Sequence, residues 1–443
     1  MSERHPPRLK RKIGQVGAIL LAFNGAVGAG IFALPGTLAA DFGAFSPWLF
    51  PLVGLGSLVI VWPFARSVAA FPDSGGPATY GRVFGRLPGF ELGWIYYISR
   101  AAAFAANANV LTAYTARWWA GADEGPLRAA LLIGVTGLFA TANIVGVKRS
   151  LRLLGGLTIL KALPLLLLAV AVIVQTFPPP NPGPPPPLTV LEAGILVTFY
   201  AFIGFENVTV PAGETRRPQR TLPRAIFATL AAMTLLYFLV QIAFVSALPA
   251  GADEGAPLID LGAWIAGPAG VLVITLTAIA SLAGNLHSNL ASTPRLTYAM
   301  ATRRDLPAWF GRIHSRFETP ANSIAFMAVL AAGLALSGSF VALAAVSVLS
   351  RLFVYAVTIA ALPKAPEPPR LSAIAWISGA AGVAVCAWAA TQASAEAWTT
   401  LGALAALSRV GYCSWRWSGA PPTTSRSDCA VRRPCAGCAP YLP

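Results

Sequence analysis

The stretch "NGAVGAGIFALP", from Asn24 to Pro35, lies inside the first long apolar run of the chain and decides how that run can fold. It holds three glycines, Gly25, Gly28 and Gly30, before it ends in proline. Glycine costs about 1 kcal/mol relative to alanine in a helix interior, and proline costs more. We therefore expect a helix of membrane-spanning length to be interrupted near its middle.

The composition places this run in a membrane. Of the 443 residues, 56% are hydrophobic and only 11% are charged, and the mean hydropathy is +0.64. Soluble domains carry about 25% charged residues. Apolar runs long enough to cross a bilayer recur along the chain, which predicts an all-α, polytopic membrane protein with about 12 transmembrane helices. The expected spans are 13–39, 46–70, 90–118, 128–147, 152–177, 190–212, 223–248, 263–300, 320–337, 340–362, 371–393 and 396–414.

Two of these spans, 13–39 and 263–300, are longer than a bilayer requires. Each is expected to contain a break or an extension along the membrane surface. The charged residues then set the orientation, because most of the 32 basic residues fall in alternate loops and at the two ends. This pattern predicts that both termini are cytoplasmic and that the protein is a multi-pass component of the cytoplasmic membrane. The net charge of +15 does not indicate a nucleic-acid partner, because the basic residues never form one surface.

The proline-rich segment "FPPPNPGPPPPL", Phe177 to Leu188, divides the chain. Its composition favours an extended polyproline II spacer in an outer loop. The span that follows contains "LVTFYAFIGFENVTVPAGE", Leu196 to Glu214, with Gly204 in the middle and Pro211 near the end. Spans 1 and 6 are thus both interrupted, five spans apart, which is typical of a five-plus-five inverted repeat.

This repeat gives the expected domain organisation. It comprises a cytoplasmic N-terminal segment at 1–12, a first inverted repeat of helices 1–5 at 13–177, and the proline-rich outer loop at 178–189. A second inverted repeat of helices 6–10 at 190–362, helices 11 and 12 at 371–414, and a disordered cytoplasmic tail at 415–443 follow. The tail contains Cys435-x-x-Cys438, but no histidine completes a zinc spacing and the cytoplasm is reducing.

Unwound backbone at membrane depth is tolerated where it lines a cavity or is buried in protein. The N-terminus of a half-helix suits a carboxylate, and unwound carbonyl groups suit an ammonium group. A zwitterionic α-amino acid matches both features. The alternative is that the glycines only allow close packing of helices.

Ionisable residues inside spans are costly and mark candidate functional positions. The chain has four charged residues at such positions, Arg100, Lys161, Glu206 and Arg351, together with His287. They are expected to face a cavity or one another. The alternatives are structural ion pairs, hydrogen-bonded packing of the histidine, or basic side chains that reach the inner interface.

Six motifs follow one another along the chain: "GAVGAGIFALPG", "SRAAAFAANANVLTAY", "YAFIGFENVTVPAGETRRPQRTLPRAI", "ASTPRLTYAMATRRDLP", "RFETPANSI" and "LSRLFVYAVTIAALP". In this order they resemble the motifs of amino acid permeases of the amino acid–polyamine–organocation (APC) superfamily. The resemblance covers nearly the whole chain to about residue 408.

The resemblance implies a leucine-transporter-like fold with helices 1 and 6 broken at the midplane. It also implies that span 1 binds the substrate carboxylate, and that span 6 supplies carbonyl groups for the amine and a wall for the side chain. Tyr200 matches the aromatic gate of span 6. The matching residues are Ala26, Val27, Gly28, Ala29 and Gly30 of span 1, and Tyr200, Ala201, Phe202 and Ile203 of span 6.

Further residues match the family's gating and coupling positions. Glu206 matches a carboxylate of the inner gate, with Arg100 or Tyr96 of span 3 as its expected partner. Lys161 matches a span 5 lysine of proton-coupled relatives, whose ammonium replaces a sodium ion. Two departures argue against an arginine/agmatine-type antiporter: Ala29 stands where some antiporters have a hydroxyl residue, and span 8 has no tryptophan.

The sequence therefore predicts a secondary active transporter that moves amino acids by alternating access, coupled to protons. The expected partners are the amino acid substrate, protons and the lipid bilayer. Neither a cofactor nor a metal nor enzymatic activity is expected. An amino acid/polyamine exchanger and a transporter-like sensor without flux remain the alternatives.

Overall fold

The computed structural model describes residues 13–71, 76–145, 151–210, 212, 215–247, 256–338, 340–365 and 372–418. Within these residues the regular structure is helical, apart from one isolated bridge between Ile13 and Thr215. The α-helices are α1 (Gln15–Ala26), α2 (Ala29–Phe42), α3 (Ser46–Ala70), α4 (Pro77–Gly81), α5 (Arg86–Ala116), α6 (Gly125–Val145), α7 (Leu151–Thr176), α8 (Leu188–Phe202), α9 (Pro218–Ala247), α10 (Pro257–Ser292), α11 (Pro294–Thr302), α12 (Ala321–Ser337), α13 (Phe340–Ala360), α14 (Ala373–Thr391) and α15 (Ala395–Ser418). Short 3-10 helices include η3 (Phe205–Thr209) and η6 (Leu362–Lys364).

Each predicted span coincides with one helix or with a broken pair of helices. In the described ranges, eight helical segments are long and apolar enough to cross a membrane, and α1 and α12 are apolar but shorter. The fold is therefore all-α with multiple spans, while the number of about 12 stays a prediction. The last helix differs from its expected end, because α15 continues past residue 414 to Ser418. The N-terminal segment 1–12 and the cysteines of the tail after that helix lie outside the described residues.

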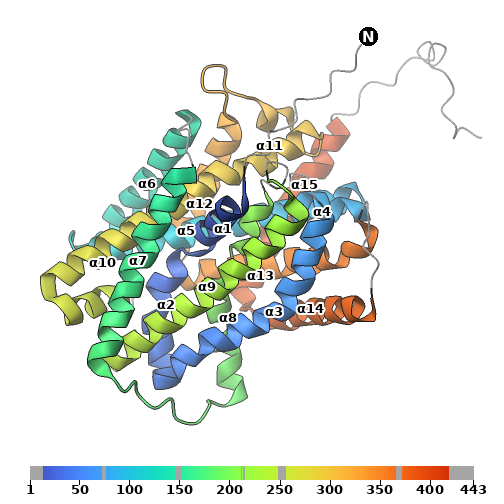
Figure 1. The fold of residues 1–443 in the computed structure, drawn as a ribbon. Coiled ribbons are helices and arrows are strands. Elements are labelled where there is room, and N and C mark those ends of the chain that lie inside the picture. The colour runs from blue at the N-terminus through green and yellow to red at the C-terminus, as the bar shows by residue number, and fades with distance from the viewer. Residues whose placement is uncertain are drawn as a thin grey trace, which may run out of the picture.

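Both predicted interruptions are present. α1 and α2 are separated by Val27 and Gly28, and α8 and η3 are separated by Ile203 and Gly204. The half-helices pair at the centre of the bundle, where α1 packs against η3 and α2 packs against α8. Figure 1 shows α1 and α2 enclosed by α5, α7, α9 and α10. The long span at 263–300 is also broken, because α10 bends at Ala266 and Gly267 and α11 begins after Thr293.

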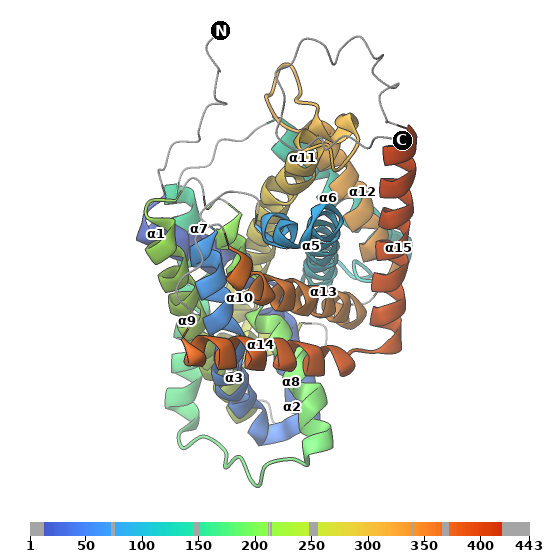
Figure 2. The ribbon, with the colours of Figure 1, turned by 90° about the vertical axis from the view of Figure 1, so that its right-hand side faces the viewer.

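The helices that follow the second repeat lie at the periphery. Figure 2 shows α14 crossing in front of α3 and α8, with α15 upright at the edge of the bundle. α14 packs on α3 and α13, and α15 packs on α13 and α5. These two helices therefore pack mainly on α3, α5 and α13.

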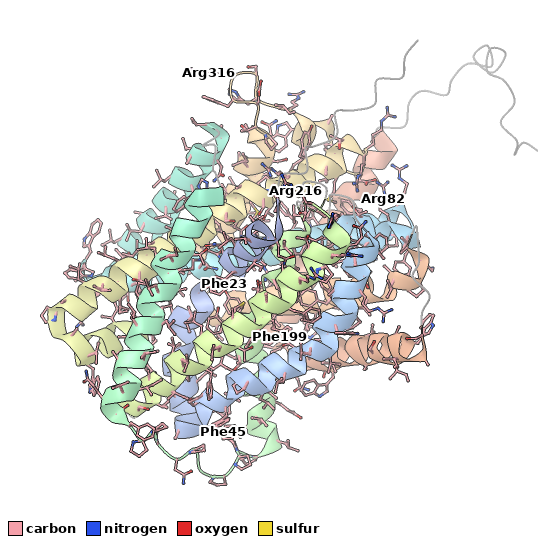
Figure 3. All side chains as sticks on the ribbon, in the orientation of Figure 1. Phe23, Phe45, Arg82, Phe199, Arg216 and Arg316 are labelled. Atoms are coloured by element: carbon pink, nitrogen blue, oxygen red, sulfur yellow. The ribbon has the colours of Figure 1, made fainter. Side chains whose placement is uncertain are left out.

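Three of the loop arginines lie at one end of the bundle, as the loop pattern predicts. Figure 3 shows Arg82, Arg216 and Arg316 at one end of the molecule and Phe45 near the other. The proline-rich connection between α7 and α8 has no regular structure and lies at the end opposite these arginines (Figure 1). This arrangement agrees with the predicted placement of the basic loops on one side of the membrane.

Candidate functional site

The carbonyl groups at the end of α1 are held by side chains from two neighbouring helices. Lys161 of α7 donates a hydrogen bond of 3.0 Å from Nζ to the carbonyl oxygen of Val27. Asn285 of α10 directs Nδ2 at the carbonyl oxygens of Asn24 and Gly25, each at 3.3 Å. A cation at a helix C-terminus also meets the negative end of the helix dipole. The break therefore leaves carbonyl groups without a partner inside the helix, and two buried side chains donate hydrogen bonds to three of them.

The start of α2 is capped by a side chain from α5. Asn107 accepts a hydrogen bond of 2.8 Å at Oδ1 from the backbone N–H of Ala29 and donates one of 2.6 Å to the carbonyl of Ala103. The first-turn N–H groups that follow Ala29 have no acceptor inside the helix. Unpaired N–H groups and the positive end of a helix dipole favour an anion at such a position.

The second break depends on Gly204. Its φ of +118° is unfavourable for residues with a side chain, and a Cβ at this position would lie 2.5 Å from the carbonyl oxygen of Gly25. The two breaks therefore touch through backbone atoms. Glu206 stabilises the turn, because its Oε2 accepts a hydrogen bond of 2.9 Å from the N–H of Gly204.

A small cavity lies where the two breaks meet. Its walls come from α1, α2, α5, α8, α10 and α13. The lining residues are Gly25, Ala26, Gly28, Ala29, Gly30, Arg100, Ala103, Asn107, Tyr200, Ile203, Asn285 and Arg351. A larger groove lies elsewhere, between α3, α8, α13 and α14, and most of its lining side chains are apolar, several of them exposed.

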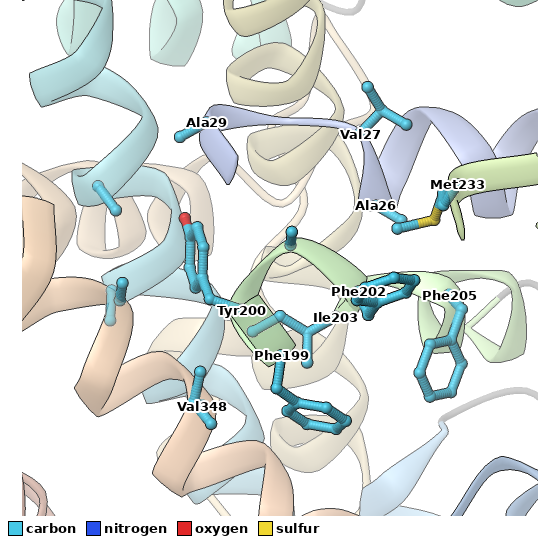
Figure 4. Close-up of a cluster of buried hydrophobic side chains, with 14 of the residues drawn as sticks. Ala26, Val27, Ala29, Phe199, Tyr200, Phe202, Ile203, Phe205, Met233 and Val348 are labelled. Carbon is cyan, nitrogen blue, oxygen red and sulfur yellow. The ribbon is translucent and has the colours of Figure 1, made fainter. Parts of the chain in front are cut away.

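Six of the nine predicted substrate residues line the cavity, namely Ala26, Gly28, Ala29, Gly30, Tyr200 and Ile203. The side chains of Val27, Ala201 and Phe202 do not. Figure 4 shows Tyr200 directed toward Ala29, whereas Phe202 lies on the far side of the turn beside Met233. Phe202 packs against Phe50 and Tyr237, with ring centroids 6.3 and 6.0 Å apart.

Ala201 and Phe202 lie away from the cavity because consecutive residues of a helix point in different directions, and Val27 lies in the extended break after α1. Ala201 instead borders Gly30, whose added Cβ would lie 2.9 Å from the Cα of Ala201. Tyr200 contacts the ring of Phe340 on α13 edge to face, with centroids 5.4 Å apart. Gly28 and Gly30 thus line the cavity, and Gly30 also permits the close contact of α2 with α8.

The prediction that Glu206 pairs with Arg100 or Tyr96 is wrong. The carboxylate pairs with Arg351 of α13, at 3.4 Å from Nε to Oε1, and accepts a hydrogen bond of 2.8 Å from the hydroxyl of Tyr355 on the same helix. Arg100 and Tyr96 of α5 both contact Oδ1 of Asn207 instead, the tyrosine at 3.2 Å. The reason is the direction of the η3 turn, which points Glu206 at α13 and the next residue at α5.

Sequence reasoning missed three asparagines and underestimated one arginine. Asn107, Asn207 and Asn285 connect the broken helices to α5 and α10. Arg351 lines the cavity and also holds Ser99 through a bond of 2.7 Å from Nε to Oγ. The available signal was the presence of amide side chains inside apolar spans, where a polar group requires a partner. His287, in contrast, lies beside Asn143 of α6 and is not among the cavity residues.

Comparison with known proteins places this architecture in a family. The model of the amino acid permease family matches residues 13–406. The serine/threonine exchanger SteT of Bacillus subtilis is 27% identical over 346 residues, which cover 73% of this chain and 76% of SteT. The methylthioribose transporter of the same organism is also 27% identical over 346 residues, 74% of this chain and 75% of that protein.

Among solved structures, MhsT in complex with L-phenylalanine has a TM-score of 0.58 with this chain, at 16% sequence identity, and the match covers 88% of this chain and 99% of MhsT. This likeness confirms the predicted leucine-transporter-like fold. The family model spans most of the chain, including both pairs of broken helices. The chain therefore has the architecture of a membrane transporter. The chain belongs to the amino acid permease family.

Proposed function

We propose that the protein is a secondary active transporter that moves an α-amino acid by alternating access, with the substrate held between the two breaks and transport coupled to protons. The observation that carries this proposal is the hydrogen bond between Lys161 and the Val27 carbonyl, at the point where α1 is interrupted. It joins an ionisable group directly to the backbone that borders the cavity.

The cavity offers complementary ends for a zwitterion. The first turn of α2 presents backbone N–H groups for the α-carboxylate. The last carbonyl groups of α1 and of α8 are acceptors for the α-ammonium, and the edge-to-face pair of Tyr200 and Phe340 adjoins this position. By this assignment the backbone recognises the part that all α-amino acids share, and the side chains of the cavity select among them.

Proton coupling follows from the isolation of Lys161. The side chain is only 1% exposed, and among the residues that the structure describes its ammonium has one hydrogen-bond acceptor and no carboxylate. While protonated, Lys161 ties α7 to the end of α1. Loss of the proton removes the charge that interacts with the helix dipole, so the link between α1 and α7 is weakened. Protonation would thus favour one orientation of the half-helix over the other.

The proposed location is the cytoplasmic membrane, with both termini in the cytoplasm. The support is the gathering of Arg82, Arg216 and Arg316 at one end of the bundle (Figure 3). A cysteine introduced at Asn181 in the proline-rich connection should react with a membrane-impermeant maleimide in intact cells. A cysteine introduced at Arg316 should react only after the membrane is opened.

The test of function is uptake into proteoliposomes that contain the purified protein. A panel of labelled amino acids, together with methylthioribose and polyamines, is supplied with and without an imposed proton gradient. Proton-driven accumulation supports the proposal. Uptake that requires an amino acid or polyamine inside the vesicles, whatever the pH gradient, would establish an exchanger instead. Binding of an amino acid without flux in either assay would establish a sensor.

A further inference from the structure

The buried charges around the cavity do not balance. Arg100 and Arg351 both line it, and their side chains are almost fully buried, at 5% and 2% exposure. Lys161 adds a third basic group at the break of α1. Within the described residues, Glu206 is the only carboxylate that pairs with any of the three. The centre of the molecule therefore carries an excess of positive charge.

Among the described residues, no second carboxylate pairs with Arg100 to balance this positive charge. Arg100 donates to neutral oxygens of Thr293, Asn207 and Ser292. These acceptors satisfy the geometry of its guanidinium group but leave its charge without a counter-charge. An arginine that is desolvated inside a membrane without a carboxylate is costly. A zwitterionic substrate with a neutral side chain would not reduce this cost, because it carries no net charge.

Arg351 has unused hydrogen-bonding capacity. Its Nε contacts both Ser99 and Glu206, and in the described part of the chain neither of its Nη groups has a hydrogen-bond partner. The ion pair with Glu206 is long, with 3.4 Å between Nε of Arg351 and Oε1 of Glu206. Among the described residues this carboxylate oxygen accepts no hydrogen bond. A guanidinium group with two open N–H positions matches a planar carboxylate well.

We propose that this cavity selects an α-amino acid with an acidic side chain, and that Arg351 is the residue that binds the side-chain carboxylate. The proposal rests on the proposed function, because the backbone of the breaks must hold the α-amino and α-carboxyl groups. Arg100, on the neighbouring wall, adds positive potential without a direct bond. The extra negative charge of the substrate offsets the excess that the protein leaves in the cavity.

Two pairs of amino acids separate the effect of side-chain charge on binding from the effect of side-chain shape. L-glutamate and L-glutamine have nearly the same size, as do L-aspartate and L-asparagine, so only the acidic group differs within each pair. Equilibrium binding of each labelled compound to the purified protein should favour the acid by about tenfold or more. Uptake into proteoliposomes should show the same preference.

Variants then locate the preference. Arg351→Gln should reduce the ratio of acid to amide affinity to about one, while Arg312→Gln, the same change at an exposed loop residue, should leave it unchanged. Because Arg351→Gln leaves Glu206 buried without its cation, a second variant, Glu206→Gln with Arg351→Gln, removes both charges together. It should retain the fold and show the same loss of preference.

The outcomes separate the two proposals. Equal or tighter binding of the amides by the native protein overturns the acidic-substrate inference and leaves amino acid transport intact. An acid preference that persists in both Arg351 variants overturns the role of that arginine. If none of the common amino acids binds or enters the vesicles, the proposed function itself fails.

Discussion

Lys161 and Val27 lie 134 positions apart in the chain, and their side-chain ammonium and backbone carbonyl are 3.0 Å from each other. The contact joins the middle of α7 to the point where α1 stops being a helix. The alternative for a lysine in a span is that its long side chain reaches the membrane surface. An exposure of 1% and a backbone partner at the break argue against it.

Replacement of Lys161 by alanine should abolish accumulation driven by a proton gradient and preserve exchange of internal for external substrate. The mutant has no group to bind and release the proton, but the backbone that holds the substrate is unchanged. Uptake with and without the gradient measures the first effect, and counterflow measures the second.

Lys364→Ala is the matched control, because that lysine lies in η6 over the ring of Phe84, at 4.7 Å, outside the cavity. The control should accumulate substrate as the native protein does. Concentrative, proton-driven uptake by Lys161→Ala would remove this lysine from the coupling mechanism.

Glu206→Gln should slow transport by about tenfold without weakening substrate binding. The amide can still accept hydrogen bonds from Gly204 and Tyr355, but it no longer balances the charge of Arg351. The equilibrium between the two orientations of the transporter should therefore shift. Glu396→Gln, at an exposed position of α15, is the control, and rates and affinities are measured in the same vesicles. Native turnover across the pH range in Glu206→Gln would exclude a gating role.

Gly28→Ala should weaken substrate binding by about tenfold while the protein stays folded. The added Cβ would lie 2.6 Å from Oδ1 of Asn107 and displace the side chain that caps α2. Gly134→Ala on α6 is the control, since a Cβ there has no neighbour within 4 Å. Equilibrium binding and a thermal melt of both variants separate loss of the site from loss of the fold. Native affinity in Gly28→Ala would show that the cap has no part in binding.

Gly204→Ala should destabilise the protein by about 2 kcal/mol or more, because both its backbone conformation and its space exclude a side chain. The φ is +118°, and the new Cβ would lie 2.5 Å from the Gly25 carbonyl. Gly183→Ala separates the two causes, since it has a φ of +69° but no atom within 4 Å. The measurement is the midpoint of thermal unfolding in detergent, and equal midpoints for the two variants would mean that the contact between the breaks adds nothing.

The candidate site was predictable in part. The glycines of the first break and Tyr200 at the second are visible as exceptions within apolar runs, and they do line the cavity. Neither Val27 nor Phe202 directs its side chain there, because a motif defines a segment and not the direction of each side chain. Asn107 could be noticed as a polar residue in a span, but its position at the start of α2 depends on how α5 packs.

The sequence by itself determined the membrane class, the positions of the long helices and the two interruptions, because apolar length, glycine and proline act locally along the chain. Only the tertiary structure decided which charges meet. Glu206 pairs with Arg351 and not with Arg100, since the turn of η3 directs two adjacent residues to opposite helices. Such pairings join residues more than 100 positions apart, and they depend on how separate helices pack, which hydropathy does not encode.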